Sequence, residues 1–120
     1  MLSLPGQLKF YLCVEPTDMR KGFDTLAAVV RESLRHDPLS GALFVFRSRR
    51  GDRLKLLYWD EDGFALLYKR LEVGVFRFPA AGERRSLTIS AADFRLLLDG
   101  VELTSVRRSP RYRTAEKSSS

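Results

Sequence analysis

The stretch LFVFRSRRGDRLKLLYWDEDGFALLYKRLE, which runs from Leu43 to Glu72, is the most informative part of this chain. Three runs of aromatic and aliphatic residues alternate with two short polar segments, a pattern typical of consecutive β-strands joined by turns. The first polar segment, from Ser48 to Arg53, is basic, and the second, from Asp60 to Gly63, is acidic. The stretch therefore predicts a meander of three strands over residues 43–71.

Side-chain alternation predicts how these strands are buried. In the middle strand, Leu54, Leu56 and Tyr58 share one face, while Lys55, Leu57 and Trp59 share the other. Apolar residues on both faces favour a central position in the sheet. In the strand Phe64–Leu71, the same period places Lys69 and Arg70 on opposite faces. Gly63 is expected to take the positive φ that closes the acidic turn.

The N-terminal part of the chain predicts a strand over Lys9–Val14 followed by an amphipathic helix over Met19–His36. We expect an N-cap at Thr17 or Asp18. One apolar stripe is predicted, formed by Phe23, Leu26, Ala27, Val30 and Leu34. Gly22 weakens the first turn, so either the backbone is closely approached there or the helix begins later.

The C-terminal part predicts a short strand at Leu87–Ile89 and a helix that Ser90 caps, with Gly100 at its end. The apolar segment Val73–Pro79 either extends the sheet or caps its end. Residues 104–120 are polar and basic, and their composition predicts a disordered tail. We expect one α+β domain over residues 1–103, with a small, mostly antiparallel sheet, the amphipathic helix on one face and the short C-terminal helix.

Charge and cysteine content narrow the function classes. The 120 residues contain 21 Lys and Arg against 15 Asp and Glu, a net charge of +6, and a basic surface is the usual footprint of a nucleic-acid partner. Cys13 is the single cysteine and lies in an apolar run, so we expect an inert buried thiol. No stretch approaches the ~20 apolar residues of a membrane span, and no signal-peptide pattern is present. We therefore expect a cytoplasmic protein with no membrane partner.

Three sequence blocks resemble one protein family. They are TDMRKG at Thr17–Gly22, GALFVFR at Gly41–Arg47 and YKRLE at Tyr68–Glu72. The chain from Pro16 to Leu103 resembles the second-open-reading-frame proteins (TnpB) of the insertion-sequence-66 group of bacterial transposons. The resemblance implies an accessory protein that assists transposition beside a separate transposase. It supplies no catalytic site, so we expect a protein that is not an enzyme and needs no cofactor or metal.

The basic hairpin is the sharpest candidate for a DNA-binding surface. Five cations fall within nine residues and are offset only by Asp52: Arg47, Arg49, Arg50, Arg53 and Lys55. On a rigid hairpin such a tip would follow a phosphate backbone or enter a groove. The alternative is a solvated turn whose charges protect the sheet edge from aggregation.

Two further basic pairs complete the predicted nucleic-acid surface. Lys69 and Arg70 belong to the third strand of the meander. Arg20 and Lys21 lie near the expected helix N-terminus, where backbone amides favour an anion. The alternative for Arg20 is an ion pair with Asp18 or another nearby carboxylate.

Other chemistry remains open from the sequence alone. A metal-dependent nuclease would need carboxylates converging from separate elements, and Asp18, Asp60 and Glu72 are the candidates for such a group. Six aromatic residues are candidate stacking platforms for single-stranded bases, although aromatic residues at strand spacing are more often part of the core: Phe44, Phe46, Tyr58, Trp59, Phe64 and Tyr68. A protein-interaction module is a different alternative, in which Val73–Pro79 and the last helix dock on the transposase. The sequence also leaves self-association and the role of the acidic turn Asp60–Asp62 open.

Overall fold

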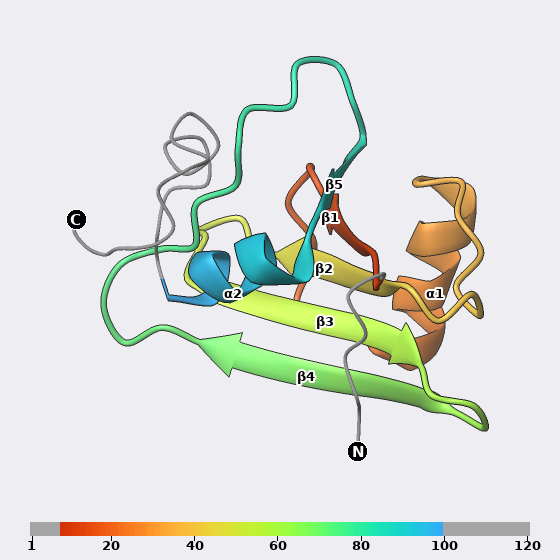
Figure 1. Cartoon of the computed structure of the whole chain (residues 1–120). Helices are drawn as coiled ribbons and strands as arrows, with labels where there is room; N and C mark the ends of the chain where they lie inside the picture. Colours follow the sequence, from red (N-terminus) through yellow and green to blue (C-terminus); the bar gives the residue numbers. More distant parts are fainter. Residues whose placement is uncertain (1–7, 100–120) are drawn as a thin grey trace.

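The computed structural model describes residues 8–99, in which five strands form a single sheet and two helices accompany it (Figure 1). The elements in chain order are β1 (Phe10–Cys13), α1 (Phe23–Glu32), β2 (Leu43–Arg47), β3 (Arg53–Trp59), β4 (Phe64–Arg70), β5 (Ser86–Ile89) and α2 (Ala91–Leu98). This is the predicted α+β class.

The strands lie in the order β4-β3-β2-β1-β5. The predicted meander is confirmed, because β2 pairs antiparallel with β3 and β3 pairs antiparallel with β4. The N-terminal strand β1 lies between β2, to which it is parallel, and β5, to which it is antiparallel. The sheet is therefore mostly antiparallel, and its one parallel pair is joined through α1, as a parallel connection requires a crossover.

Strand alternation divides the interior into two clusters, one on each face of the sheet. The cluster on the α1 face contains Leu26, Ala27 and Val30 of α1 together with Cys13, Leu34, Phe44, Phe46 and Leu57. The cluster on the α2 face contains Phe94 and Leu97 of α2 together with Phe10, Leu12, Leu43, Val45, Leu54, Leu56, Phe76, Leu87 and Ile89. Each inner strand contributes to both faces, as the apolar residues on both sides of β3 indicate.

The first helix begins later than its periodicity predicts. Its N-cap is Gly22, not Thr17 or Asp18, and the Gly22 N–H donates to Thr25 Oγ1 at 2.9 Å. No atom lies within 4 Å of the position a Gly22 side chain would take, so Gly22 marks a late start and not a close approach. Phe23, predicted to be buried, is 48% exposed.

The turn between β3 and β4 also differs from the prediction. The positive φ falls on Glu61, at 64°, and not on Gly63. The turn closes through Asp60, whose N–H donates to the Gly63 carbonyl at 2.7 Å.

In the C-terminal half, the structure confirms the predicted start of α2 and decides the conformation of Val73–Pro79, which the sequence left open. Ser90 caps α2 as predicted, since its Oγ accepts from the Asp93 N–H at 3.1 Å. The segment Val73–Pro79 is not a strand, and it belongs to the irregular connection between β4 and β5. The predicted helix end at Gly100, the domain end at residue 103 and the basic tail at residues 104–120 lie outside the described residues.

Candidate nucleic-acid interface

The loop that joins β2 to β3 is held by its own backbone. The Ser48 N–H donates to the Arg53 carbonyl at 2.9 Å, and the Gly51 N–H donates to the Ser48 carbonyl at 2.9 Å. The Ser48 hydroxyl adds a third contact, because its Oγ accepts from the Arg53 N–H at 3.1 Å. Gly51 takes a φ of +86°, which favours glycine. The loop is therefore a defined turn rather than a loose excursion.

The connection after β4 braces this loop from the side. The Phe76 N–H donates to the Gly51 carbonyl at 2.8 Å, and the Leu71 N–H donates to the Asp52 carbonyl at 2.8 Å. The Phe76 side chain is 1% exposed. A Cβ on Gly51 would lie 3.2 Å from the Cβ of Val75, so the two segments pack closely enough to require glycine.

Arg49 and Arg50 project from this braced loop into solvent. Both are exposed, and within residues 8–99 neither forms a hydrogen bond or an ion pair. Two adjacent guanidinium groups that form no ion pair keep all of their donors for an external anion. They are the part of the predicted basic hairpin that the structure leaves available.

Arg53 and Arg70 lie side by side on the α1 face, directly opposite each other in the β3–β4 register. Two like charges at directly opposite positions repel each other. Each of the two arginines has a neighbour that offsets this repulsion. Arg53 Nη1 donates to the Tyr68 hydroxyl at 3.1 Å, and Arg70 Nη2 lies 3.3 Å from Glu72 Oε2. The bond to Tyr68 raises the pKa of Arg53 above its ordinary value. These four residues line an open depression in the surface.

Arg47 serves the interior instead of the surface. Its Nη1 donates to the Phe76 carbonyl at 3.1 Å, and its guanidinium lies 4.2 Å from the centre of the Phe78 ring. Partial burial lowers the pKa of Arg47 below its ordinary value. Arg47 and Lys69 both lie opposite Leu54 in the register, so they belong to the α2 face, away from Arg53 and Arg70. The predicted split of Lys69 and Arg70 between faces is thus observed.

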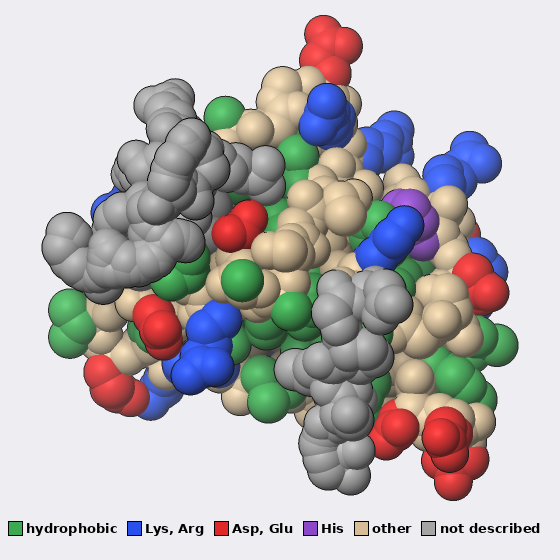
Figure 2. Space-filling model, in the orientation of Figure 1, with side chains coloured by type: hydrophobic (Ala, Val, Ile, Leu, Met, Phe, Trp, Pro, Cys, Tyr) green, Lys and Arg blue, Asp and Glu red, His purple; other side chains and the backbone are tan. Residues whose placement is uncertain are grey.

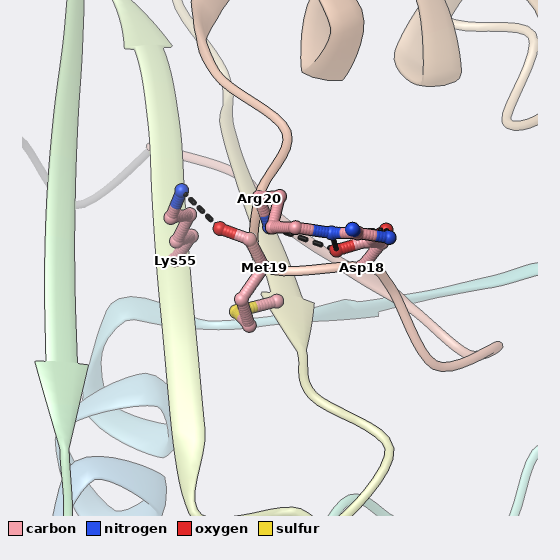
Figure 3. Close-up of polar contacts among 4 residues, drawn as sticks. All are labelled: Asp18, Met19, Arg20 and Lys55. Carbon is pink, nitrogen blue, oxygen red and sulfur yellow. Dashed lines mark hydrogen bonds and ion pairs between the residues drawn. The ribbon is translucent and has the colours of Figure 1, made fainter.

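Lys55 is buried, contrary to its predicted place on the basic surface. Its side chain is 7% exposed, and Nζ donates to the carbonyls of Met19 and Lys21, each at 2.7 Å. Figure 3 shows the bond to Met19 reaching from β3 to the segment before α1. Nζ also lies 4.7 Å from the centre of the Tyr68 ring. The alternation of β3, which groups Lys55 with Leu57, is the sequence signal for this burial.

Arg20 and Lys21 do not lie in the first turn of α1, where the sequence placed them, because they precede the Gly22 cap. The alternative for Arg20 is confirmed: its Nη2 lies 2.7 Å from Asp18 Oδ2, and its Nε lies 3.1 Å from Oδ1 (Figure 3). This guanidinium holds the pKa of the Asp18 carboxyl well below its usual range. Arg20 is 91% exposed, but its charge is already matched.

The acidic residues do not assemble the arrangement that a two-metal nuclease needs. Asp60 follows β3 at one end of the β3–β4 hairpin, and Glu72 follows β4 at the other end. A seven-residue strand separates these ends by about 20 Å, whereas the metals of such a site lie ~4 Å apart. Asp18 is paired with Arg20. Within residues 8–99, no three potential ligands gather around a metal position.

The aromatic residues proposed for base stacking fall into two groups. Phe44 and Phe46 are fully buried, so they are core residues, as strand spacing favours, and are not available for stacking. Trp59 and Phe64 pack edge to face, with centroids 5.1 Å apart. Tyr68 is 50% exposed and borders the depression with Arg53 and Arg70.

Fold and surface together define a small α+β protein with an arginine-rich hairpin and, among residues 8–99, no cluster of metal-ligating side chains. Comparison with known proteins identifies the family to which this chain belongs. The sequence model of the family described as IS66 Orf2 like protein matches residues 8–108. The chain belongs to this family, whose members are transposition accessory proteins and not known enzymes. Membership indicates association with the transposase of the same element.

Two curated relatives come from Sinorhizobium fredii (strain NBRC 101917 / NGR234), and both are described as uncharacterized. Protein y4jC is 41% identical over 110 residues, which cover 92% of this chain and 93% of the relative. Protein y4hO is 41% identical over 102 residues, or 85% and 88% of the two chains. No solved structure matches. None of the helices in the described range is long and apolar enough to cross a membrane.

Proposed function

We propose that this chain is a non-enzymatic accessory factor in transposition that binds the phosphate backbone of DNA through its basic end. The basic end consists of Arg49, Arg50, Arg53 and Arg70. The observation that carries the proposal is the pair Arg49 and Arg50, which are exposed on a braced loop and form no ion pair within residues 8–99.

Rigidity supports this role as much as charge does. The loop is bonded to Phe76 and Leu71 as well as to itself, so its backbone loses little conformational entropy when an anion binds. Guanidinium groups match phosphate oxygens in a bidentate geometry. Arg53 and Arg70 extend the cationic surface from the loop onto the α1 face.

The salt dependence of DNA binding tests this proposal. Four phosphate contacts predict a log–log slope of affinity against salt of about −4, and Arg49→Ala/Arg50→Ala should reduce its size by about 2. Fluorescence anisotropy with transposon-end, random duplex and single-stranded DNA at several salt concentrations measures both quantities.

The matched control is Arg84→Ala/Arg85→Ala, which removes the same charge from an exposed adjacent pair in the β4–β5 connection. This control should reduce the slope by less than half as much as the loop variant. A slope near zero for the unmodified protein, or equal losses in the two double variants, would contradict binding through the loop.

The alternative function is docking on the transposase through Val73–Pro79. This segment exposes less apolar surface than its sequence suggests. The Phe76 side chain is buried in the core on the α2 face, and the Phe78 ring is covered in part by the Arg47 guanidinium. Of the apolar residues there, Val73 is 89% exposed and Val75 is 37% exposed. We therefore assign this segment to bracing the basic end.

A further inference from the structure

Strand β4 forms an open edge of the sheet. It lies last in the order β4-β3-β2-β1-β5 and pairs with β3 through seven consecutive residue pairs. Figure 1 shows no other described element along its outer side. Edge strands are usually protected from intermolecular pairing by proline, a bulge, short length or charged side chains. Between Phe64 and Arg70, β4 has no proline and no bulge, and its charged residues, Lys69 and Arg70, stand only at its end.

The hydrogen bonds to β3 show which backbone groups of β4 face outward. Gly63 and Leu71 bond to Asp60 and Asp52, and bonded pairs alternate along an antiparallel ladder. The residues between Gly63 and Leu71 with odd numbers therefore bond to β3. The N–H and carbonyl groups of Phe64, Leu66, Tyr68 and Arg70 point away from the sheet and have no strand partner within residues 8–99.

The side chains along this edge are apolar in the middle and oppositely charged at the ends. Leu67 is 47% exposed and Tyr68 is 50% exposed. Before β4 lies the exposed acidic turn Asp60–Asp62, and the strand ends with exposed Lys69 and Arg70. Figure 2 shows acidic side chains gathered at the lower right, where Figure 1 draws this turn, and basic and acidic side chains side by side toward the other end of the hairpin.

We propose that β4 pairs antiparallel with β4 of a second copy of this chain, with Leu67 on the twofold axis. An antiparallel copy reverses the charge order, so the basic end of one strand meets the acidic end of the other. In this register Leu66 bonds to Tyr68 of the second copy, and Phe64 bonds to Arg70. It is the register that uses all four outward-facing residues of both copies.

Face alternation agrees with this register. Tyr68 and Leu66 both lie on the α1 face, and Leu67 meets its own copy on the α2 face. Arg70 lies opposite Phe64 of the second copy and diagonal to its Asp62. In the dimer the exposed contact of Arg70 with Glu72 of its own chain would be joined by a cross-strand contact with Asp62. The pairing gives the acidic turn a role and joins two sheets into one. It goes beyond the proposed DNA binding and does not depend on it.

The oligomeric state of the full chain without DNA tests the pairing. Sedimentation equilibrium should show a monomer–dimer equilibrium, and Leu67→Lys should raise the dissociation constant at least tenfold because it places two ammonium groups on the axis. Val73→Lys is the matched control: Val73 is 89% exposed and lies outside β4, so this variant should dimerise as the unmodified chain does. Circular dichroism checks that both variants are folded.

Disulfide trapping tests the register. Under mild oxidation Leu67→Cys should form a covalent dimer, since paired Cα atoms at the axis lie within the ~7 Å that a disulfide spans. Ala65→Cys should not, because its two copies would be offset by about 14 Å along the strands. Cys13 is 6% exposed and is common to both variants. A monomer at all concentrations, a dimer unaffected by Leu67→Lys, or trapping through residue 65 in preference to 67 would each overturn the proposal.

Discussion

At the scale of single residues, Lys55 shows how a cation in a basic run becomes part of the interior. A buried ammonium is costly unless its donors are satisfied, and Lys55 satisfies two of them with the carbonyls of Met19 and Lys21. These contacts connect β3 to the segment before α1, more than thirty residues away along the chain. The side chain therefore holds tertiary structure and is unavailable to DNA.

Replacing Lys55 tests that role. Lys55→Met keeps the length of the side chain but leaves both carbonyls without a partner, so the free energy of unfolding should fall by about 2 kcal/mol. Urea denaturation measures the change. Lys9→Met, at an exposed lysine, should change stability by less than about 0.5 kcal/mol. If Lys55→Met were as stable as the unmodified protein, the ammonium would not be a structural contact.

At the scale of elements, the start of α1 follows from the same contact. A helix starting at Thr17 or Asp18 would use the carbonyls of Met19 and Lys21 as acceptors within its first turns. In the structure both carbonyls accept from Lys55 instead. The helix begins at Phe23 after these groups are satisfied, and its hydrophobic period remains correct for Leu26, Ala27 and Val30.

The connection between β4 and β5 is also defined by its contacts. Phe76 fills the interior on the α2 face and bonds through its backbone to the basic loop. Phe76→Ala should therefore lower the free energy of unfolding by about 3–5 kcal/mol and speed hydrogen exchange at the Gly51 and Arg53 amides. Val73→Ala, at an exposed valine in the same segment, should leave both measurements nearly unchanged. Unaltered exchange in Phe76→Ala would mean that the connection does not brace the loop.

At the scale of the whole molecule, the two hydrophobic clusters share one sheet. Each inner strand sends alternate side chains to the α1 face and the α2 face. Loss of either cluster therefore removes support from the same strands, and both faces should unfold together. Small single domains commonly unfold in this all-or-none manner.

Deletions in the two clusters test this coupling. Leu26→Ala on the α1 face and Leu97→Ala on the α2 face, both fully buried, should each cost about 2–5 kcal/mol. Each should move the transitions seen by far-ultraviolet circular dichroism and by Trp59 fluorescence by the same amount. Trp59 lies on the same face of the sheet as Leu57. If Leu97→Ala shifted the circular dichroism transition but not the Trp59 fluorescence transition, the two faces would unfold separately.

Much of this architecture follows from local sequence. The period-two runs of Leu43–Leu71 predicted three strands in their correct pairing, and Ser90 predicted the start of α2. The same local reasoning located the arginines of the hairpin tip and the opposite faces of Lys69 and Arg70. These features depend on neighbours a few residues away, through alternation and capping, and are therefore visible in one sequence.

The remaining features were decided by tertiary structure. Placement of β1 between β2 and β5, the inward turn of Arg47 and Lys55, and the burial of Phe76 all join groups far apart in the chain. Local propensity carries no information about such partners, because their energies arise only when the sheet brings the segments together. The sequence by itself determined where charge is concentrated, and packing determined which of those charges remain free to bind.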